Sequence, residues 1–351
     1  IKANNLIGKE WSPPTSGQYL PVRSPYTGKE IGAVALSSER DVQDAVARAK
    51  AAFPEWRLTP TKERSQYLFN LRNLVLKHID ELANLAACEA GKMPVEAKAG
   101  ILKGIEVMEF ALSLQNLDNG AALAVSRGVT CEYRRAPLGV VAGIVPFNFP
   151  AMVPMWLYPI AMTVGNCFIL KPSEKVPLTT SKIAQLVLEA GYPPGVFSVV
   201  NGNKGAVDAI LAAPDVRAVA FVGSTPVARS IFVTGSQNGK RVLALGGAKN
   251  YSIVVPDADY ELTVDGVVNS FTGCAGQRCM ALSVLVAVGD VEKIIRGVVE
   301  RAGQIKLGTE MGAIIDKQSC ERIVQHIGLA QKEGATIALD GRDKKMTGDH
   351  S

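Results

Sequence analysis

The spacing of hydrophobic residues along the chain changes near residue 138. Before that point apolar residues recur at three- and four-residue intervals, for example at Val42, Val46 and Ala49. This spacing is typical of surface helices that bury one face. The first 120 residues are therefore predicted to be helical. The individual helices are expected at Ser37–Ala52, Thr61–Gly91 and Pro94–Leu114.

From Leu138 onward, apolar runs of strand length alternate with longer helical patterns. Near-continuous apolar strands joined by helices predict a parallel, doubly wound sheet with both faces covered. Such sheets bind ligands beyond the carboxyl ends of their strands. The predicted strands are Gly139–Val145, Asn166–Leu170, Phe197–Val200, Val216–Phe221 and Arg241–Leu245, and the helices are Ala151–Val164, Thr179–Ala190, Gly205–Ala212 and Thr225–Thr234.

A second alternation begins at Tyr251 and predicts another α/β unit. Its strands are expected at Ser252–Val255, Val284–Val288 and Thr336–Leu339, and its helices at Tyr260–Phe271, Val291–Gln304 and Ser319–Glu333. These are too few strands to close a core, so we expect the C-terminal part of this domain to be missing. The charged tail 340–351 is predicted to be disordered.

The chain is therefore predicted to be an α/β protein with two domains. Residues 1–120 and 136–246 form the first domain, residues 121–135 an extended ribbon that leaves it, and residues 247–351 the incomplete second domain.

Composition narrows the function classes. Among 351 residues the net charge is only +5, and the 38 Lys and Arg residues are scattered, so no nucleic-acid partner is expected. No apolar run reaches the roughly 18 residues of a membrane helix, and no signal peptide is recognised. Six scattered cysteines favour a reducing, cytoplasmic setting. The only close pair, Cys274 and Cys279, lacks a zinc spacing, so no metal is expected.

The ends of the predicted parallel strands carry polar and charged residues, although the glycine fingerprint of dinucleotide folds is absent. Lys171, Ser173 and Glu174 follow one buried strand, and Ser224 follows another at the start of a helix. Separately, these could be a surface turn and a plain helix cap. Together, at one edge of a sheet, they favour a dinucleotide site, with Lys171 and Glu174 near ribose hydroxyls and Ser224 near a pyrophosphate.

Cysteine and small residues dominate the segment Phe271–Cys279. Cysteine attacks as the thiolate and needs positive or amide-rich surroundings, and Arg278 adjoins Cys279. With three histidines in the chain, all distant in sequence, an imidazole-activated nucleophile is not expected. For Cys274 a structural role in a packed loop is favoured. For Cys279 the residues alone leave both a nucleophile and a structural cysteine open.

Four sequence motifs resemble those of the aldehyde dehydrogenase superfamily in order and spacing. They are Pro146–Pro150, Leu170–Glu174, Phe221–Ser224 and Gln277–Cys279, and the resemblance extends from about Asn5 to Gly341. Within the superfamily, three motifs resemble those of the CoA-acylating methylmalonate-semialdehyde dehydrogenases. They are Phe147–Pro150, Gly247–Asn250 and Gly276–Ala281.

The resemblance implies roles for individual residues. Cys279 would attack an aldehyde, the Asn148 amide and the Cys279 N–H would form the oxyanion hole, and hydride transfer to NAD would leave a thioester. The first domain would bind NAD, the second would be catalytic, and the ribbon 121–135 would serve a homodimer or homotetramer. The implied cofactor-binding residues are Val145, Phe147, Lys171, Ser173, Glu174, Lys175, Ser224 and Gly246.

Two departures from the superfamily affect the predicted chemistry. Ala244 stands where hydrolytic members carry a glutamate that activates water, and a methyl group cannot act as a base. We therefore expect acyl transfer to coenzyme A as co-substrate. Arg278 and Lys103 are the candidates for binding the carboxylate of (methyl)malonate semialdehyde. Lys103 replaces the arginine of related enzymes and loses its bidentate fork, and it could instead lie on a solvated helix face.

Alternative functions remain open at this point. The chain could be a non-catalytic NAD-binding fragment or scaffold, a hydrolytic aldehyde dehydrogenase, or a dehydrogenase for an uncharged short aldehyde. A related reductase acting on acyl phosphates is a weaker alternative, and the motifs at residues 147–150 and 171–174 disfavour it.

Overall fold

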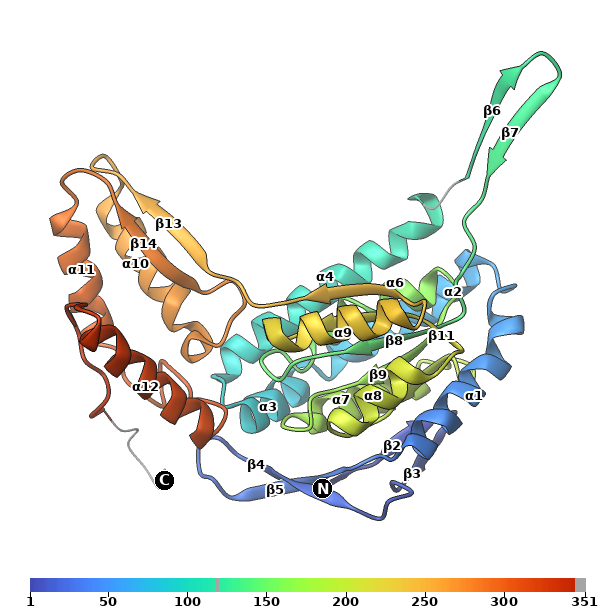
Figure 1. Cartoon of the computed structure of the whole chain (residues 1–351), viewed down its shortest axis with the longest axis horizontal. Helices are drawn as coiled ribbons and strands as arrows, with labels where there is room; N and C mark the ends of the chain where they lie inside the picture. Colours follow the sequence, from blue (N-terminus) through green and yellow to red (C-terminus); the bar gives the residue numbers. More distant parts are fainter. Residues whose placement is uncertain (118–119, 345–351) are drawn as a thin grey trace.

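The computed structural model describes residues 1–117 and 120–344. A seven-stranded sheet with the order β12-β11-β8-β9-β10-β2-β3 lies at its centre (Figure 1). The strands from β12 to β10 are parallel, which confirms the predicted sheet. They are β8 (Val140–Ile144), β9 (Cys167–Lys171), β10 (Phe197–Val199), β11 (Val216–Val222) and β12 (Arg241–Leu245).

Helices cover both faces of this sheet. On one face α1 (Glu39–Trp56) contacts β8, β9 and β10, and α8 (Lys204–Ala212) and α9 (Thr225–Gln237) pack beside it over β11 and β12. The other face carries α6 (Tyr158–Thr163) and α7 (Pro177–Glu189), with an outer layer of α2 (Thr61–Lys77), α3 (Ile79–Ala90) and α4 (Pro94–Leu117). The strands β8 and β9 are buried at every position, as expected when both faces are covered.

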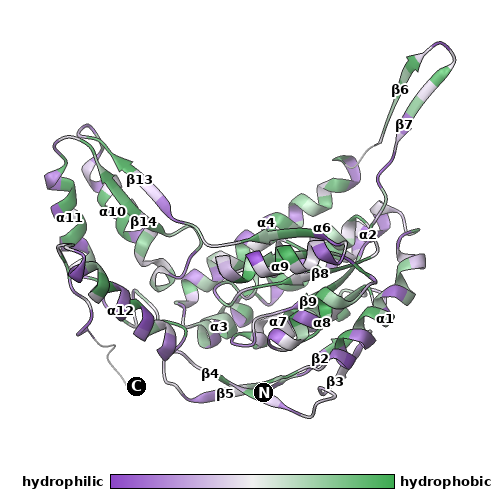
Figure 2. Ribbon diagram, in the orientation of Figure 1, coloured by the Kyte–Doolittle hydropathy of each residue, from purple (hydrophilic) through white to green (hydrophobic). Residues whose placement is uncertain are grey.

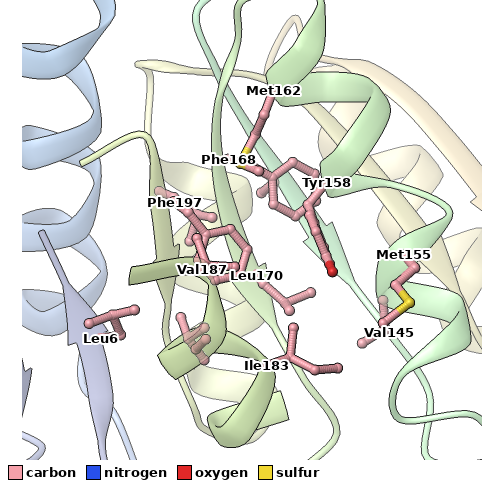
Figure 3. Close-up of a cluster of buried hydrophobic side chains, with 14 of the residues drawn as sticks. Leu6, Val145, Met155, Tyr158, Met162, Phe168, Leu170, Ile183, Val187 and Phe197 are labelled. Carbon is pink, nitrogen blue, oxygen red and sulfur yellow. The ribbon is translucent and has the colours of Figure 1, made fainter. Parts of the chain in front are cut away.

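Aromatic side chains fill the core between the sheet and the second helical face (Figure 3). Tyr158 lies edge-on to Phe197 with 5.4 Å between ring centroids, and Phe197 stacks on Phe168 at 6.5 Å. These edge-on and offset arrangements suit the aromatic quadrupole. They anchor β9 and β10, whose carboxyl ends carry the candidate site.

The prediction that the first 120 residues are helical is wrong for residues 2–35. This segment forms β1 (Lys2–Ala3), β2 (Asn5–Ile7), β3 (Glu10–Ser12), β4 (Tyr19–Arg23) and β5 (Glu30–Ala35). The strand β2 pairs antiparallel with β10, almost two hundred residues away, and β1, β5 and β4 form a separate sheet. Strands of two to six residues are too short to show a period-2 pattern, and distant partners determine them.

The predicted helix Ala151–Val164 is broken into α5 (Met152–Met155) and α6. Pro159 stands in the first turn of α6. A proline ring clashes with the carbonyl of the fourth residue before it and cannot donate a backbone hydrogen bond, so the helix ends and begins again. Proline in the first turn loses nothing, because those N–H groups have no partner within the helix.

A smaller α/β unit follows β12, as predicted. Its strands β13 (Asn250–Val254) and β14 (Leu282–Ala287) are parallel, and α10 (Tyr260–Thr272), α11 (Glu292–Gly303) and α12 (Lys317–Lys332) accompany them. The predicted strand Thr336–Leu339 is wrong, because these residues have no strand partner within the described chain. Figure 2 shows alternating hydrophilic and hydrophobic patches along α11 and α12. Residues 345–351 of the predicted disordered tail lie outside the described residues.

A long hairpin projects from the body of the molecule (Figure 1). It pairs β6 (Ala121–Ser126) with β7 (Val129–Tyr133), and every residue of both strands is exposed. The hairpin occupies the segment predicted as a ribbon, and its oligomerisation role stays a prediction. The same holds for the domain boundary at residue 246, where β12 leads directly into the smaller unit. Among the helices that the structure describes, none has the length and apolarity needed to cross a membrane.

A buried carboxylate joins α3 to the start of α7. Glu89 accepts hydrogen bonds from the N–H groups of Leu178 at 2.7 Å and Thr179 at 2.9 Å, donors that the first turn of a helix leaves unpaired. Burial raises the pKa of Glu89 to about 7, although both hydrogen bonds act to lower it. The helix that follows the Lys171–Glu174 turn therefore begins on an acid that titrates near neutrality.

This titration makes stability depend on pH. A folded-state pKa raised from 4.5 to about 7 means that the folded chain holds the extra proton in this window. Stability from Glu89 is therefore complete below pH 4.5 and is lost as the pH rises through 7. Relative to Glu89→Gln, which cannot titrate, the wild type should lose about 3 kcal/mol of unfolding free energy over this range. Urea denaturation at several pH values measures the difference, and parallel curves for the two proteins would contradict it.

Candidate active site

A cavity of about 470 Å³ lies at the carboxyl ends of β8, β9 and β11. Its lining includes five of the residues predicted to bind a dinucleotide, namely Val145, Lys171, Ser173, Glu174 and Ser224. The parallel sheet brings these residues together from three strands, as Figure 1 shows for the strands themselves. The other three, Phe147, Lys175 and Gly246, are not among the described residues that line it.

Lys171 and Glu174 form an ion pair of 3.1 Å in this cavity. The Lys171 side chain is 6% exposed, and burial lowers its pKa while Glu174 acts to raise it. For Glu174 burial acts to raise the pKa, but the charges of Lys171 and Lys175 and hydrogen bonding hold it below its usual range. Each partner thus favours the charged form of the other, against the effect of burial. They offer a buried ammonium and a carboxylate to ligand hydroxyls.

The start of α9 faces the same cavity through Ser224, Pro226 and Val227. Ser224 is the residue before the helix, and within the described chain its hydroxyl makes no hydrogen bond to the helix amides. Free N–H groups and the helix dipole at this end attract an anion. Nearby, Gly247 donates its N–H to the Thr225 hydroxyl at 2.9 Å, and a side chain on Gly246 would press on that hydroxyl. Gly246 therefore lets the end of β12 approach α9 closely.

Phe147 and Lys175 connect the two α/β units. The Lys175 ammonium lies 5.6 Å from the centre of the Phe147 ring and forms an ion pair of 2.5 Å with Asp316. Asp316 also caps α12 by accepting the Ser319 N–H. Phe147 packs against a small buried cluster that includes Ile315. These two residues thus contact the smaller unit beside the cavity.

Cys279 follows a strained turn after α10. The turn Gly273–Gly276 places Cys274 and Ala275 at a φ of 53°, which is left-handed backbone. Such a conformation costs about 1–2 kcal/mol for each residue with a Cβ. Cys279 is exposed and Cys274 is buried. These environments suit the two interpretations of the sequence, a reactive thiol at Cys279 and a packing residue at Cys274.

Side chains from distant segments hold this loop in place. The Asn148 amide donates to the Gln277 carbonyl at 3.0 Å. The Gln277 side chain donates to the carbonyls of Cys274 and Ala313 and accepts the Ile315 N–H. An amide nitrogen carries two hydrogens, so Asn148 has a second one to offer beside the loop that carries Cys279.

Asn250 holds the other side of Cys279. Its amide donates to the carbonyls of Cys279 and Ala281, both at 2.8 Å. The sequence did not identify Asn250 or Gln277 as functional. Both belong to motifs that carried the resemblance, Asn250 to residues 247–250 and Gln277 to residues 276–281. The available signal for both residues was an amide side chain within such a motif.

The two predicted carboxylate-binding cations are engaged by the protein's own carboxylates. Arg278 pairs with Glu96 at 2.9 Å, and its Nε donates to the Cys274 sulfur at 3.3 Å. Lys103 pairs with Glu106 at 2.9 Å on the exposed surface of α4. No hydrogen bond or shared acceptor joins Arg278 and Lys103 within the described chain. Their joint action on a substrate stays a prediction.

Lys92 is a buried cation that sequence reasoning missed. It is 3% exposed, and its ammonium lies 3.4 Å from the centre of the ring of Phe149, the residue that follows Asn148 in the sequence. Burial lowers its pKa to about 8, and the adjacent Cys274 acts to raise it. The favourable cation–π contact offsets part of the cost of burial. No group of three His, Cys, Asp or Glu side chains in residues 1–117 and 120–344 could hold a metal ion.

Comparison with known proteins shows the family of this chain. The sequence profile of the aldehyde dehydrogenase family matches residues 11–350. The chain belongs to this family. A malonate-semialdehyde dehydrogenase of Geobacillus kaustophilus (strain HTA426) is 44% identical over 98% of the chain and 72% of its own length. The predicted family and fold class are thereby confirmed.

Solved structures of family members superpose closely. A Sinorhizobium meliloti 1021 protein, named as a methylmalonate-semialdehyde dehydrogenase and crystallised with NAD, has a TM-score of 0.97 at 39% identity. The match covers 100% of this chain and 73% of that one. The methylmalonate-semialdehyde dehydrogenase of Oceanimonas doudoroffii gives a TM-score of 0.96 at 42% identity, covering 99% and 73%.

We expect Asn250→Ala to loosen the loop 273–282, which carries Cys279. The change leaves the Cys279 and Ala281 carbonyls without their amide donor, at a cost of about 1–3 kcal/mol. Amide hydrogen exchange in residues 276–282 should accelerate while the large sheet remains protected. Asn238→Ala is the matched control, because it also removes an amide-to-carbonyl bond, to Leu211, just after the end of α9. Equal exchange in residues 276–282 for both variants would refute this role of Asn250.

Proposed function

We propose that this chain catalyses the NAD-dependent oxidation of a short aldehyde through a thioester on Cys279 and transfers the acyl group to coenzyme A. The observation that carries the proposal is the nucleophile loop. An exposed cysteine follows a strained turn, the Asn148 amide donates to that loop, and Pro146, two residues before Asn148, lines a cavity suited to a dinucleotide. The names of its relatives support an acidic substrate, malonate or methylmalonate semialdehyde.

The cavity at the sheet edge fits NAD. Lys171 and Glu174 would hold the adenosine ribose through its hydroxyls, and the start of α9 with Ser224 would receive the pyrophosphate. Val145 and Ser173 would line the same site. Glu174 keeps its charge, and a carboxylate near the ribose disfavours a 2′-phosphate. Phe147, Lys175 and Gly246 would shape the surrounding walls. When bound, the nicotinamide supplies the hydride acceptor.

The first half-reaction needs a thiolate and a place for negative charge. The Cys279 sulfur forms a bond with the aldehyde carbon, and the carbonyl oxygen becomes an oxyanion. The Asn148 amide and the Cys279 N–H would stabilise that oxyanion. Return of the oxyanion electrons to a C=O bond expels the hydride and leaves a thioester on Cys279. Asn250 contributes by holding the Cys279 backbone in place.

The second half-reaction favours a thiol over water. Ala244 in β12 cannot deprotonate water. A thiol has a pKa of about 8.5, whereas the pKa of bulk water is far higher, so coenzyme A ionises without a strong base. Its sulfur attacks the thioester carbon and releases the Cys279 thiolate. The hydrolytic alternative lacks the glutamate that would activate water, because Ala244 stands at its position. A non-catalytic NAD-binding fragment would use Lys171 and Glu174 but would not require Asn148 on the loop of an exposed Cys279.

We also propose a cytoplasmic homodimer or homotetramer. The β6–β7 hairpin exposes Leu123, Val125, Val129 and Tyr133, which suits a surface that another subunit covers. The six cysteines, all within the described residues, are free thiols, which fits a reducing compartment.

Omitting coenzyme A tests the proposal most directly. With NAD and propanal alone, we expect a burst of about one equivalent of NADH per chain, followed by a slow steady rate. Mass spectrometry should then find the acyl adduct on Cys279. Adding coenzyme A should restore continuous turnover. Cys279→Ala should abolish both phases, whereas Cys320→Ala, which removes an exposed thiol on α12, should leave them unchanged. Full steady turnover without coenzyme A would reject the acylating reaction.

A further inference from the structure

Glu96 is a carboxylate at the start of α4 that reaches the nucleophile loop. Its Oε1 accepts hydrogen bonds from the Cys274 N–H at 2.7 Å and from Arg278 Nη2 at 2.9 Å. Its Oε2 accepts the Met93 N–H at 3.3 Å. The side chain is 15% exposed. Glu96 is therefore fixed by backbone donors on both sides as well as by Arg278.

Arg278 folds back across the turn that precedes Cys279. A Cβ on Gly273 would lie 2.1 Å from the Arg278 guanidinium carbon, so only glycine at 273 admits this conformation. The Nε donates to the Cys274 sulfur, while the side chain keeps 32% of its surface exposed. A cation adjoining Cys279 in sequence thus rests on an internal carboxylate but stays accessible to solvent.

We infer that Glu96 is a specificity-determining residue that competes with the substrate carboxylate for Arg278. A semialdehyde acid presents the same group as Glu96, and a guanidinium binds either carboxylate with similar geometry. Arg278 must exchange one for the other when an acidic aldehyde binds. A neutral aldehyde requires no exchange. This inference rests on the proposed function.

The exchange leaves Glu96 with partners. After Arg278 departs, its oxygens still accept the N–H groups of Cys274 and Met93, so no buried carboxylate becomes unpaired. Breaking a buried ion pair is costly mainly when one charge is stranded. Partly exposed pairs are weak, and Arg278 is partly exposed. The Glu96–Arg278 pair is therefore labile enough to respond to substrate, and Glu96 sets the affinity for acidic aldehydes.

The variant Glu96→Gln tests the competition. Glutamine keeps an oxygen for the Cys274 N–H but removes the negative charge. We expect KM for malonate semialdehyde to fall by roughly fivefold, with kcat unchanged and KM for propanal unchanged. Glu96→Asp, which keeps the charge, should retain a high KM for the acidic aldehyde. Glu109→Gln removes a carboxylate that pairs with Arg72 on the same helix and should alter neither aldehyde.

A double-variant cycle identifies the group through which Glu96 acts. In an Arg278→Ala background, Glu96→Gln should no longer lower KM for malonate semialdehyde, because no cation remains to be released. An undiminished effect there would overturn the inference, as would equal changes for propanal and malonate semialdehyde, which would show that Glu96 only supports the loop. Propanal oxidation by the wild type distinguishes a failure of this inference from a failure of the proposed function. If neither aldehyde is oxidised, the proposed function fails and this inference fails with it.

Discussion

The structure depends on how the loop before Cys279 is held. Its turn contains two residues in left-handed backbone, and the loop satisfies only some of its own polar groups. Side chains from other segments supply hydrogen bonds to its backbone that no helix or strand provides. Asn148 from the large sheet, Glu96 from α4 and Asn250 from the smaller unit each bind its backbone. The loop that carries Cys279, the proposed nucleophile, is thus positioned by three segments that are far apart in sequence.

The same three contacts explain why the two α/β units form one site. Asn148 follows β8, at the edge where the dinucleotide cavity opens, and Asn250 begins β13 of the smaller unit. The loop between α10 and β14 lies between them. Lys175 and Asp316 add a second connection. A site built this way holds the Cys279 loop against Asn148 only when both units are folded.

Several cations around the site are occupied by protein groups. Arg278 is bound by Glu96, Lys175 by Asp316 and Lys171 by Glu174, while Lys92 lies on the Phe149 ring. Uncompensated buried charges are costly, so a site for anionic ligands needs such partners before the ligand arrives. Ligand carboxylates and hydroxyls then replace or join these contacts. Selectivity depends on which of them can be exchanged.

The sequence by itself determined the parallel sheet and the residues at its carboxyl edge. Buried parallel strands are continuous apolar runs, and each places its following residues at the same edge, so Lys171, Glu174 and Ser224 could be assigned to one site. From the residues alone a structural role was favoured for Cys274, while both roles stayed open for Cys279 until the family resemblance implied a nucleophile. The tertiary structure decided the strands of residues 2–35, the loss of the strand Thr336–Leu339 and the partners of Arg278 and Lys175. Those outcomes depend on pairings across many residues, for which no local pattern exists.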